Sequence, residues 1–247
     1  MIRQFRLTLL GMGFLALGFA PSQPWIPCDQ ALLTAQMAKF DALMAKQTRC
    51  KLTTELVSYR RSTDVVPSDH AFSTVWRHGK RFKAEQLGLM SYQNDSLCAA
   101  VDEEDKKVVI SEPRGTQENL LSDRVKGLLY EVSSIACQDI NGGKLFRVEY
   151  ARNSPNAHMD ITYETDGWMS EVVLQLRSGN YTGGEGPLTS IDDPKVVFRF
   201  QRPGPLEGKA AEGIGQGPLA FIRSGTHGLV LTGKWSGYRL IDTRYRP

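Results

Sequence analysis

Histidine, cysteine and long apolar runs are all scarce in this 247-residue chain, and each scarcity argues against a class of function. The sequence has no G-x-S-x-G, H-E-x-x-H or Walker motif, so the usual signatures of hydrolases, zinc proteases and nucleotide-binding loops are missing. It has no C-x-x-C pair and no histidine near a cysteine, which argues against a metal site. We therefore expect no enzymatic activity, no metal and no cofactor.

A histidine beside a carboxylate occurs at His158 and Asp160. Residues i and i+2 of a strand share one face, but no nucleophile accompanies this pair, so we assign it no catalytic role. The acidic clusters at 102–105 and 192–193 lack the alternating ligand spacing of an EF-hand loop, and we interpret them as solvated turns.

The chain also lacks a surplus of one charge sign. It carries 30 basic and 27 acidic residues, a net charge of +3. Loss of Arg3 and Arg6 with an N-terminal leader leaves 28 basic and 27 acidic residues. This near-neutral balance gives no electrostatic footprint for nucleic acid or an anionic membrane surface. The apolar content of 41% is sufficient for a core.

The N-terminus has the layout of an export signal. Arg3 and Arg6 precede an apolar run from Leu7 to Ala20. This run is shorter than the roughly 20 residues that a membrane-spanning helix needs. Small residues place a cleavage site near Ser22/Gln23. We therefore predict a signal peptide over residues 1–22 and a periplasmic mature protein without a transmembrane anchor.

Two alternatives to a cleaved signal remain, an uncleaved anchor and a lipid attached at Cys28. Lipidation requires small residues just before the cysteine. Here Trp25, Ile26 and Pro27 precede it, and they are too bulky or too rigid.

Four cysteines in an exported chain favour disulfides; they are Cys28, Cys50, Cys98 and Cys137. Apolar spacing predicts a helix over residues 30–46, which separates Cys28 from Cys50 by about 30 Å. A disulfide needs Cα atoms within roughly 7 Å, so these two are not expected to pair. We expect each of them to pair with one of Cys98 and Cys137; four buried free thiols are the alternative.

Beyond the first helix the apolar period changes from 3.6 to 2, which predicts a series of antiparallel strands. A hairpin turn is expected at His78-Gly79-Lys80. A second helix is expected over Thr116–Cys137, with two short helices around Gly127 as the alternative. Strands resume at Lys144–Ala151, His158–Asp166, Trp168–Arg177 and Lys195–Pro203. The sheet domain is assigned to residues 23–203. Residues 204–247, rich in glycine and proline before the last strands, are expected to pack on the same domain.

The order of these elements, with the phrases "HGKRFKAE" and "SLCAAVDEEDKKVVISEP", resembles the LolA/LolB-like periplasmic lipoprotein carriers. The resemblance implies an α+β fold in which a strongly curved antiparallel sheet, an unclosed barrel, wraps around a few helices. It also implies an apolar cavity for acyl chains. The four cysteines and the long C-terminal segment exceed what a minimal carrier needs.

A curved sheet that does not close leaves an apolar face for helices or a ligand to cover. Seven aromatic residues are the cavity candidates: Trp76, Phe82, Tyr92, Phe146, Tyr150, Phe198 and Phe200. We expect a non-catalytic carrier for a lipid, a lipoprotein acyl chain or another apolar ligand in the bacterial cell envelope. Its partners would be a lipid or lipidated protein and an envelope protein, with no nucleic acid. The alternative is an accessory protein that uses the same fold to bind proteins, with its core filled.

Overall fold

One large sheet dominates the computed structural model, which describes residues 24–86, 88–113, 127–177, 193–208, 213–226 and 228–244. The predicted signal peptide lies outside these residues. The strands of the sheet are β1 (Ile26–Pro27), β2 (Arg49–Tyr59), β3 (Asp69–His78), β4 (Arg81–Gln86), β5 (Leu89–Gln93), β6 (Cys98–Asp102), β7 (Lys107–Ser111), β8 (Val132–Ile140), β9 (Gly143–Tyr150), β10 (Asn156–Glu164), β11 (Met169–Leu176), β12 (Lys195–Phe200), β13 (Gly204–Pro205) and β16 (Arg239–Asp242). A separate hairpin contains β14 (Ile222–Gly225) and β15 (Gly228–Leu231). Within the described residues, helix α1 spans Gln30–Ala45, and two short 3₁₀ helices, η2 and η3, span Gly217–Phe221 and Gly233–Trp235.

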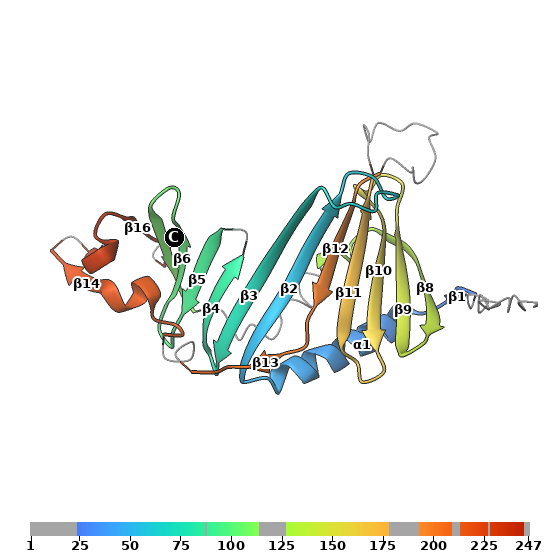
Figure 1. Ribbon diagram of the computed structural model, residues 1–247, viewed down its shortest axis with the longest axis horizontal. Coiled ribbons are helices and arrows are strands. Elements are labelled where there is room, and N and C mark those ends of the chain that lie inside the picture. Colours follow the sequence, from blue (N-terminus) through green and yellow to red (C-terminus); the bar gives the residue numbers. More distant parts are fainter. Residues whose placement is uncertain are drawn as a thin grey trace, which may run out of the picture.

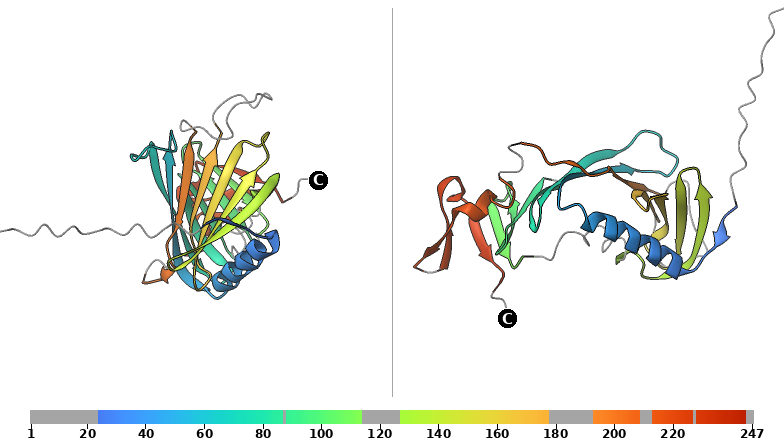
Figure 2. Two further views of the ribbon diagram at one scale, coloured as in Figure 1. Left: turned by 90° about the vertical axis from the view of Figure 1, so that its right-hand side faces the viewer. Right: turned by 90° about the horizontal axis from the view of Figure 1, so that it is seen from below.

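The strand order of the large sheet is β1-β8-β9-β10-β11-β12-β2-β3-β4-β5-β6-β7-β16, and β13 adds to β2. Neighbouring strands are antiparallel except β16, which runs parallel to β7. The sheet curves strongly but does not close, because β1 and β16 are its two separate edges (Figures 1 and 2). The predicted fold class, a curved and unclosed antiparallel sheet with helical cover, is confirmed. Among the described residues, no helix is long and apolar enough to cross a bilayer.

Helix α1 forms where the sequence predicts it. The Asp29 side chain accepts a hydrogen bond from the Ala31 backbone N–H at 3.0 Å, which satisfies a donor of the first turn. The apolar side chains that recur every three or four residues are buried against strands β8 to β12. We call the resulting cluster the α1 core; its central members are Leu33, Met37, Phe40, Met44, Phe146, Val148, Tyr150, Met159, Ile161, Tyr163, Trp168, Met169, Val172 and Phe200.

The second predicted helix is wrong in its C-terminal part. Residues 114–126 lie outside the described residues, but from Val132 onward the chain forms strand β8 instead of a helix. Glu131, just before the strand, has φ +60°, a left-handed conformation that interrupts any right-handed helix. Beyond it, Ile135 and Cys137 are buried on alternate positions and β8 pairs with β9, so the period of 2 prevails.

The two ends of the sheet bury opposite faces. We call the face that carries α1 the α1 face. At the β5–β7 end, the opposite face of the sheet is the one that is buried. There the C-terminal segment, with η2, η3 and the β14–β15 hairpin, covers a second cluster (Figure 2). We call it the distal core; it contains Tyr92, Ala99, Val101, Val108, Ile110, Leu219, Leu231 and Trp235.

Candidate functional site

Four of the seven predicted cavity residues belong to the α1 core. Phe146 and Tyr150 of β9 and Phe200 of β12 are buried in it, and Phe198 packs against it. The rings here make ordinary core contacts: Phe40 meets Trp168 edge-on at 5.2 Å between centroids, and Phe146 meets Tyr163 at 5.9 Å. Burial raises the pKa of Tyr150 to about 12, which keeps its hydroxyl neutral.

The other three candidates lie elsewhere. Tyr92 belongs to the distal core on the opposite face of the sheet. Trp76 shares that face, because the register places it opposite Lys83, which in turn lies opposite Tyr92. The Lys83 ammonium lies over the Trp76 ring, 4.8 Å from its centroid. Phe82 points to the α1 face and is buried. The seven aromatic residues therefore do not line one common surface.

Phe82 belongs to a buried row that crosses five strands of the α1 face. Directly opposed residues in adjacent strands form this row: Cys50, Arg77, Phe82, Gln93 and Cys98. Its polar members make hydrogen bonds to the backbone. Arg77 Nη1 donates to the Met44 carbonyl at the end of α1, at 3.4 Å, and Gln93 Nε2 donates to the Lys80 carbonyl at 3.0 Å. This row lies near one end of each of the five strands.

Next to the buried row lies a continuous line of half-buried, mostly apolar side chains on the same face. It crosses seven strands in a single register, and we call it the apolar strip; its members are Leu52, Val75, Ala84, Ser91, Ala100, Val109 and Ile241. Leu52 packs against the α1 core, so the strip begins there and ends at the edge strand β16. Six strand spacings of about 4.8 Å give it a length of roughly 29 Å.

The other side of the strip is bordered by a mostly polar row, two residues further along each strand. It contains Thr54, Ser73, Gln86, Leu89, Asp102, Lys107 and Arg239. The strip is thus an apolar band between a buried row and a polar border. Its central side chains, Ala84, Ser91 and Ala100, are small and half-buried.

Sequence motifs do not reveal this strip, because alanine and serine carry no chemical signal of their own. Only the alternation along "KAEQ", "MSYQ" and "CAAVD" placed such residues on one face. Which face they occupy depends on the register between strands, and a single sequence does not give that register.

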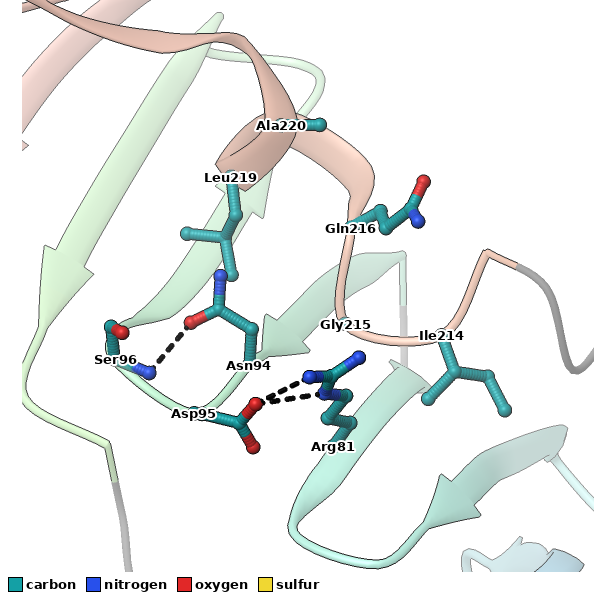
Figure 3. Close-up of a pocket in the computed structure, with 9 residues that line it drawn as sticks. All are labelled: Arg81, Asn94, Asp95, Ser96, Ile214, Gly215, Gln216, Leu219 and Ala220. Carbon is teal, nitrogen blue, oxygen red and sulfur yellow. Dashed lines mark hydrogen bonds and ion pairs between the residues drawn. The ribbon is translucent and has the colours of Figure 1, made fainter.

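A pocket of about 230 Å³ lies between the β5–β6 turn and the C-terminal segment (Figure 3). The side chains of Arg81, Asp95 and Asn94 in it already have protein partners. The Arg81 guanidinium pairs with the Asp95 carboxylate through Nε at 3.1 Å. Asn94 Oδ1 accepts hydrogen bonds from the backbone N–H groups of Ser96 and Leu97 at 2.9 and 2.8 Å. We interpret this pocket as packing around a turn, because its polar side chains hold the turn together.

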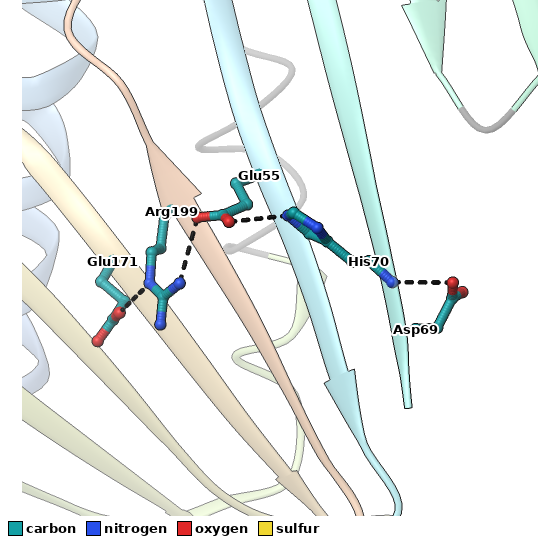
Figure 4. A network of polar contacts seen from close by, with 5 residues as sticks. All are labelled: Glu55, Asp69, His70, Glu171 and Arg199. Carbon is teal, nitrogen blue, oxygen red and sulfur yellow. Dashed lines mark hydrogen bonds and ion pairs between the residues drawn. The ribbon is translucent and has the colours of Figure 1, made fainter. Parts of the chain in front are cut away.

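A chain of charged side chains crosses the outer face of strands β11, β12, β2 and β3 (Figure 4). Arg199 bridges Glu171, at 3.0 Å, and Glu55, at 3.2 Å, and Glu55 also contacts His70 Nε2 at 2.8 Å. The hydrogen bond from Arg199 is the largest of the effects that lower the pKa of Glu55. These are cross-strand pairs of a solvated face, and they stabilise strand register.

His158 and Asp160 share the outer face of β10 as predicted, but the carboxylate is already occupied. Arg147 binds both Asp160 oxygens, at 2.7 and 2.6 Å, in a bidentate pair. Burial lowers the pKa of His158. The Asp102 carboxylate accepts a turn hydrogen bond from the Asp105 N–H at 2.9 Å. Within the described ranges, no three histidine, cysteine, aspartate or glutamate side chains gather closely enough to hold a metal ion.

All four cysteines carry free thiols in this structure. Cys28 directly follows strand β1 and continues its register with β8, the strand that carries Cys137. Cys50 and Cys98, in contrast, are four strand spacings apart in one cross-strand row, about 19 Å. A bridge between Cys50 and Cys98 is impossible in this sheet, so this one of the expected pairings is excluded.

No protein-family model matches the sequence, and no curated protein sequence matches it. Solved structures do match. One is a LolA superfamily protein from Nitrosomonas europaea, with 8% identity and a TM-score of 0.30; the match covers 73% of this chain and 96% of that chain. Another is a DUF1329 family protein from Desulfovibrio piger, with 8% identity and a TM-score of 0.30; the match covers 71% of this chain and 94% of that chain.

Proposed function

We propose that the chain is an exported, non-catalytic binding protein for an extended apolar ligand, the acyl chain of a lipid or lipoprotein, in the bacterial cell envelope. The apolar strip carries this proposal. It is long, narrow and half-buried, and its central residues are small. Burial of apolar surface is favourable by roughly 25 cal/mol per Å², so an acyl chain lying along such a band gains free energy at each methylene.

The chemistry of the strip's borders supports the same ligand. The polar row beside the strip includes Asp102 and Lys107, which lie opposite one another on β6 and β7. A ligand with an apolar chain and a polar head can place the chain on the strip and the head at this border. In the α1 core, in contrast, the aromatic residues are engaged with one another.

Binding of a dansyl-labelled fatty acid to the purified chain tests this proposal. Ala84→Phe and Ala100→Phe fill the centre of the strip, and each is expected to weaken binding at least tenfold. Glu85→Phe is the matched control, because Glu85 follows Ala84 on β4 but is exposed on the other face. Melting curves of all three variants confirm folding. Equal binding by the Ala84 and Glu85 variants would contradict a ligand on the strip.

The source of the acyl chain is tested by competition. A lipopeptide with two acyl chains displaces the probe if the ligand is a lipidated protein, and a free fatty acid displaces it equally well if any acyl chain suffices. Native mass spectrometry of protein purified from a bacterial periplasm provides a second measurement. A lipid-sized adduct that is lost on denaturation supports carriage, and its absence weighs against it.

A second function, protein binding by the outer surface, is favoured by one observation. Val65 and Val66, in the connection between β2 and β3, are 92% and 75% exposed, and Phe72 nearby on β3 is 53% exposed. Exposed apolar side chains at one end of a sheet are typical of interaction sites. Val65→Asp combined with Val66→Asp should abolish capture of an envelope partner while fatty-acid binding is unchanged. Loss of fatty-acid binding in this variant would contradict the separation of the two surfaces.

A further inference from the structure

The short strand β1 is the segment that brings Cys28 to the sheet. Ile26 lies opposite Cys137, and Pro27 lies opposite Ala136. The Cys28 N–H then donates to the Ile135 carbonyl at 3.0 Å, so the antiparallel register continues by one residue. Cys28 is therefore the diagonal neighbour of Cys137, on the same side of the strands, and both side chains pack against the α1 core.

We propose that Cys28 and Cys137 form a disulfide that fastens the N-terminal end of α1 to strand β8. The two thiols lie close enough that Cys137 is among the causes that raise the pKa of Cys28. Diagonal neighbours lie about 7–8 Å apart between Cα atoms, and a disulfide accepts up to roughly 7 Å. The small approach that remains falls on β1, a strand of two residues at the sheet edge.

The reaction is a thiol–disulfide exchange with an oxidised dithiol protein of the export compartment. One cysteine thiolate attacks the donor disulfide, and a mixed disulfide forms. The other cysteine thiolate then displaces the donor sulfur, so the Cys28–Cys137 bond forms while the donor gains two electrons and two protons as a dithiol. Burial, followed by the neighbouring Cys137, raises the pKa of Cys28 to about 11 in the folded chain. The exchange therefore proceeds while the chain folds, before this thiol is buried.

The bond has a structural consequence for the α1 core. At its C-terminal end, α1 is joined to β2 through residues 46–48 alone. At its N-terminal end, only Asp29 separates Cys28 from the helix. A disulfide at Cys28 therefore fixes the second end of the helix, and the helix that covers this core is held at both ends. Opening of the α1 core by an outward swing of α1 is then excluded while the bond is intact.

The full chain tests the proposal in two preparations, one secreted into a bacterial periplasm and one purified reduced and refolded with oxidised glutathione. Free thiols are alkylated with N-ethylmaleimide after denaturation. We expect Cys50 and Cys98 to be alkylated, and a proteolytic digest to contain one linked peptide joining Cys28 to Cys137. Alkylation of all four cysteines in both preparations, or a linked peptide with any other pairing, would overturn the proposal.

Thermal melting provides the second readout. Reduction of the oxidised wild type should lower the midpoint by an amount on the order of 10 °C, because the bond closes a loop of more than one hundred residues. Cys28→Ser and Cys28→Ala should melt at the same temperature with and without reductant. Cys50→Ser is the matched control, since a serine hydroxyl can donate to the Gln47 carbonyl as the Cys50 thiol does. It should keep the full difference between oxidised and reduced samples. A wild type whose melting is insensitive to reductant would contradict the bond.

Discussion

Tyr163 offers a sharp test of the packing in the α1 core. Its side chain is fully buried, and its hydroxyl has no hydrogen-bond partner within the described part of the chain. Burial first, and the Asp41 carboxylate second, strongly raise the pKa of this hydroxyl, so it stays neutral. An unpaired buried polar group costs about 1–3 kcal/mol relative to its hydrated state. Tyr163→Phe removes that group and leaves the ring contact with Phe146 intact.

We therefore expect Tyr163→Phe to raise the free energy of unfolding by about 1 kcal/mol, measured by urea denaturation at pH 7. For a chain of this size, this corresponds to a midpoint increase of about 2–4 °C. Tyr150→Phe is the control, because the Tyr150 hydroxyl has a weak partner, the Met159 sulfur at 3.9 Å. That variant should change stability less. A loss of 1 kcal/mol or more in Tyr163→Phe would refute the reasoning, because it would require a strong partner for the hydroxyl.

Four further variants test the fold. Phe40→Ala should lower the free energy of unfolding by about 3–5 kcal/mol in urea titrations, because it leaves a cavity beneath α1. Gly143→Ala should destabilise by at least about 1–3 kcal/mol, since its Cβ would lie 1.9 Å from a carbonyl oxygen of the neighbouring strand. Gly237→Ala, whose Cβ meets nothing within 4 Å, should be neutral, and equal melting of the two glycine variants would contradict this packing. The hydrogen bond from Arg202 lowers the pKa of Asp166, so this pair stabilises the fold above the unfolded pKa and is lost as pH falls. Arg202→Gln should therefore melt lower than wild type at pH 7 and equally at pH 2, and a difference that persists at pH 2 would count against the pair.

The sequence allowed local structure to be predicted well. The helix from Gln30 and the turn at Gly79 follow from apolar spacing and from a glycine, which here has φ +62°. The helix predicted over Thr116–Cys137 failed where strand pairing overrode an apolar pattern compatible with both structures. Helices and turns depend mainly on residues close in the sequence, so a single sequence is sufficient to predict them.

The site was harder to predict, because it depends on pairing between distant strands. The aromatic residues were predicted to line one cavity, but Tyr92 and Phe82 point to opposite faces of the sheet. The change of buried face between β2 and β6 has no signature in any single strand. It follows from where the C-terminal segment packs, and a segment rich in glycine and proline carries no apolar period that would reveal this.

The position of β2 has a consequence for how the chain acquires its structure. Leu56 of β2 pairs with Phe198 of β12, and Val109 of β7 pairs with Ile241 of β16. Strands near the N-terminus therefore pair with strands that are synthesised much later. Contacts this distant in sequence slow folding, and they leave apolar strand edges unpaired during synthesis. Strands β2 to β7 form a meander that pairs locally, while both of its outer edges stay open until the C-terminal third arrives. A nascent or truncated chain therefore exposes two sheet edges, and we expect it to depend on chaperones that the finished protein does not need.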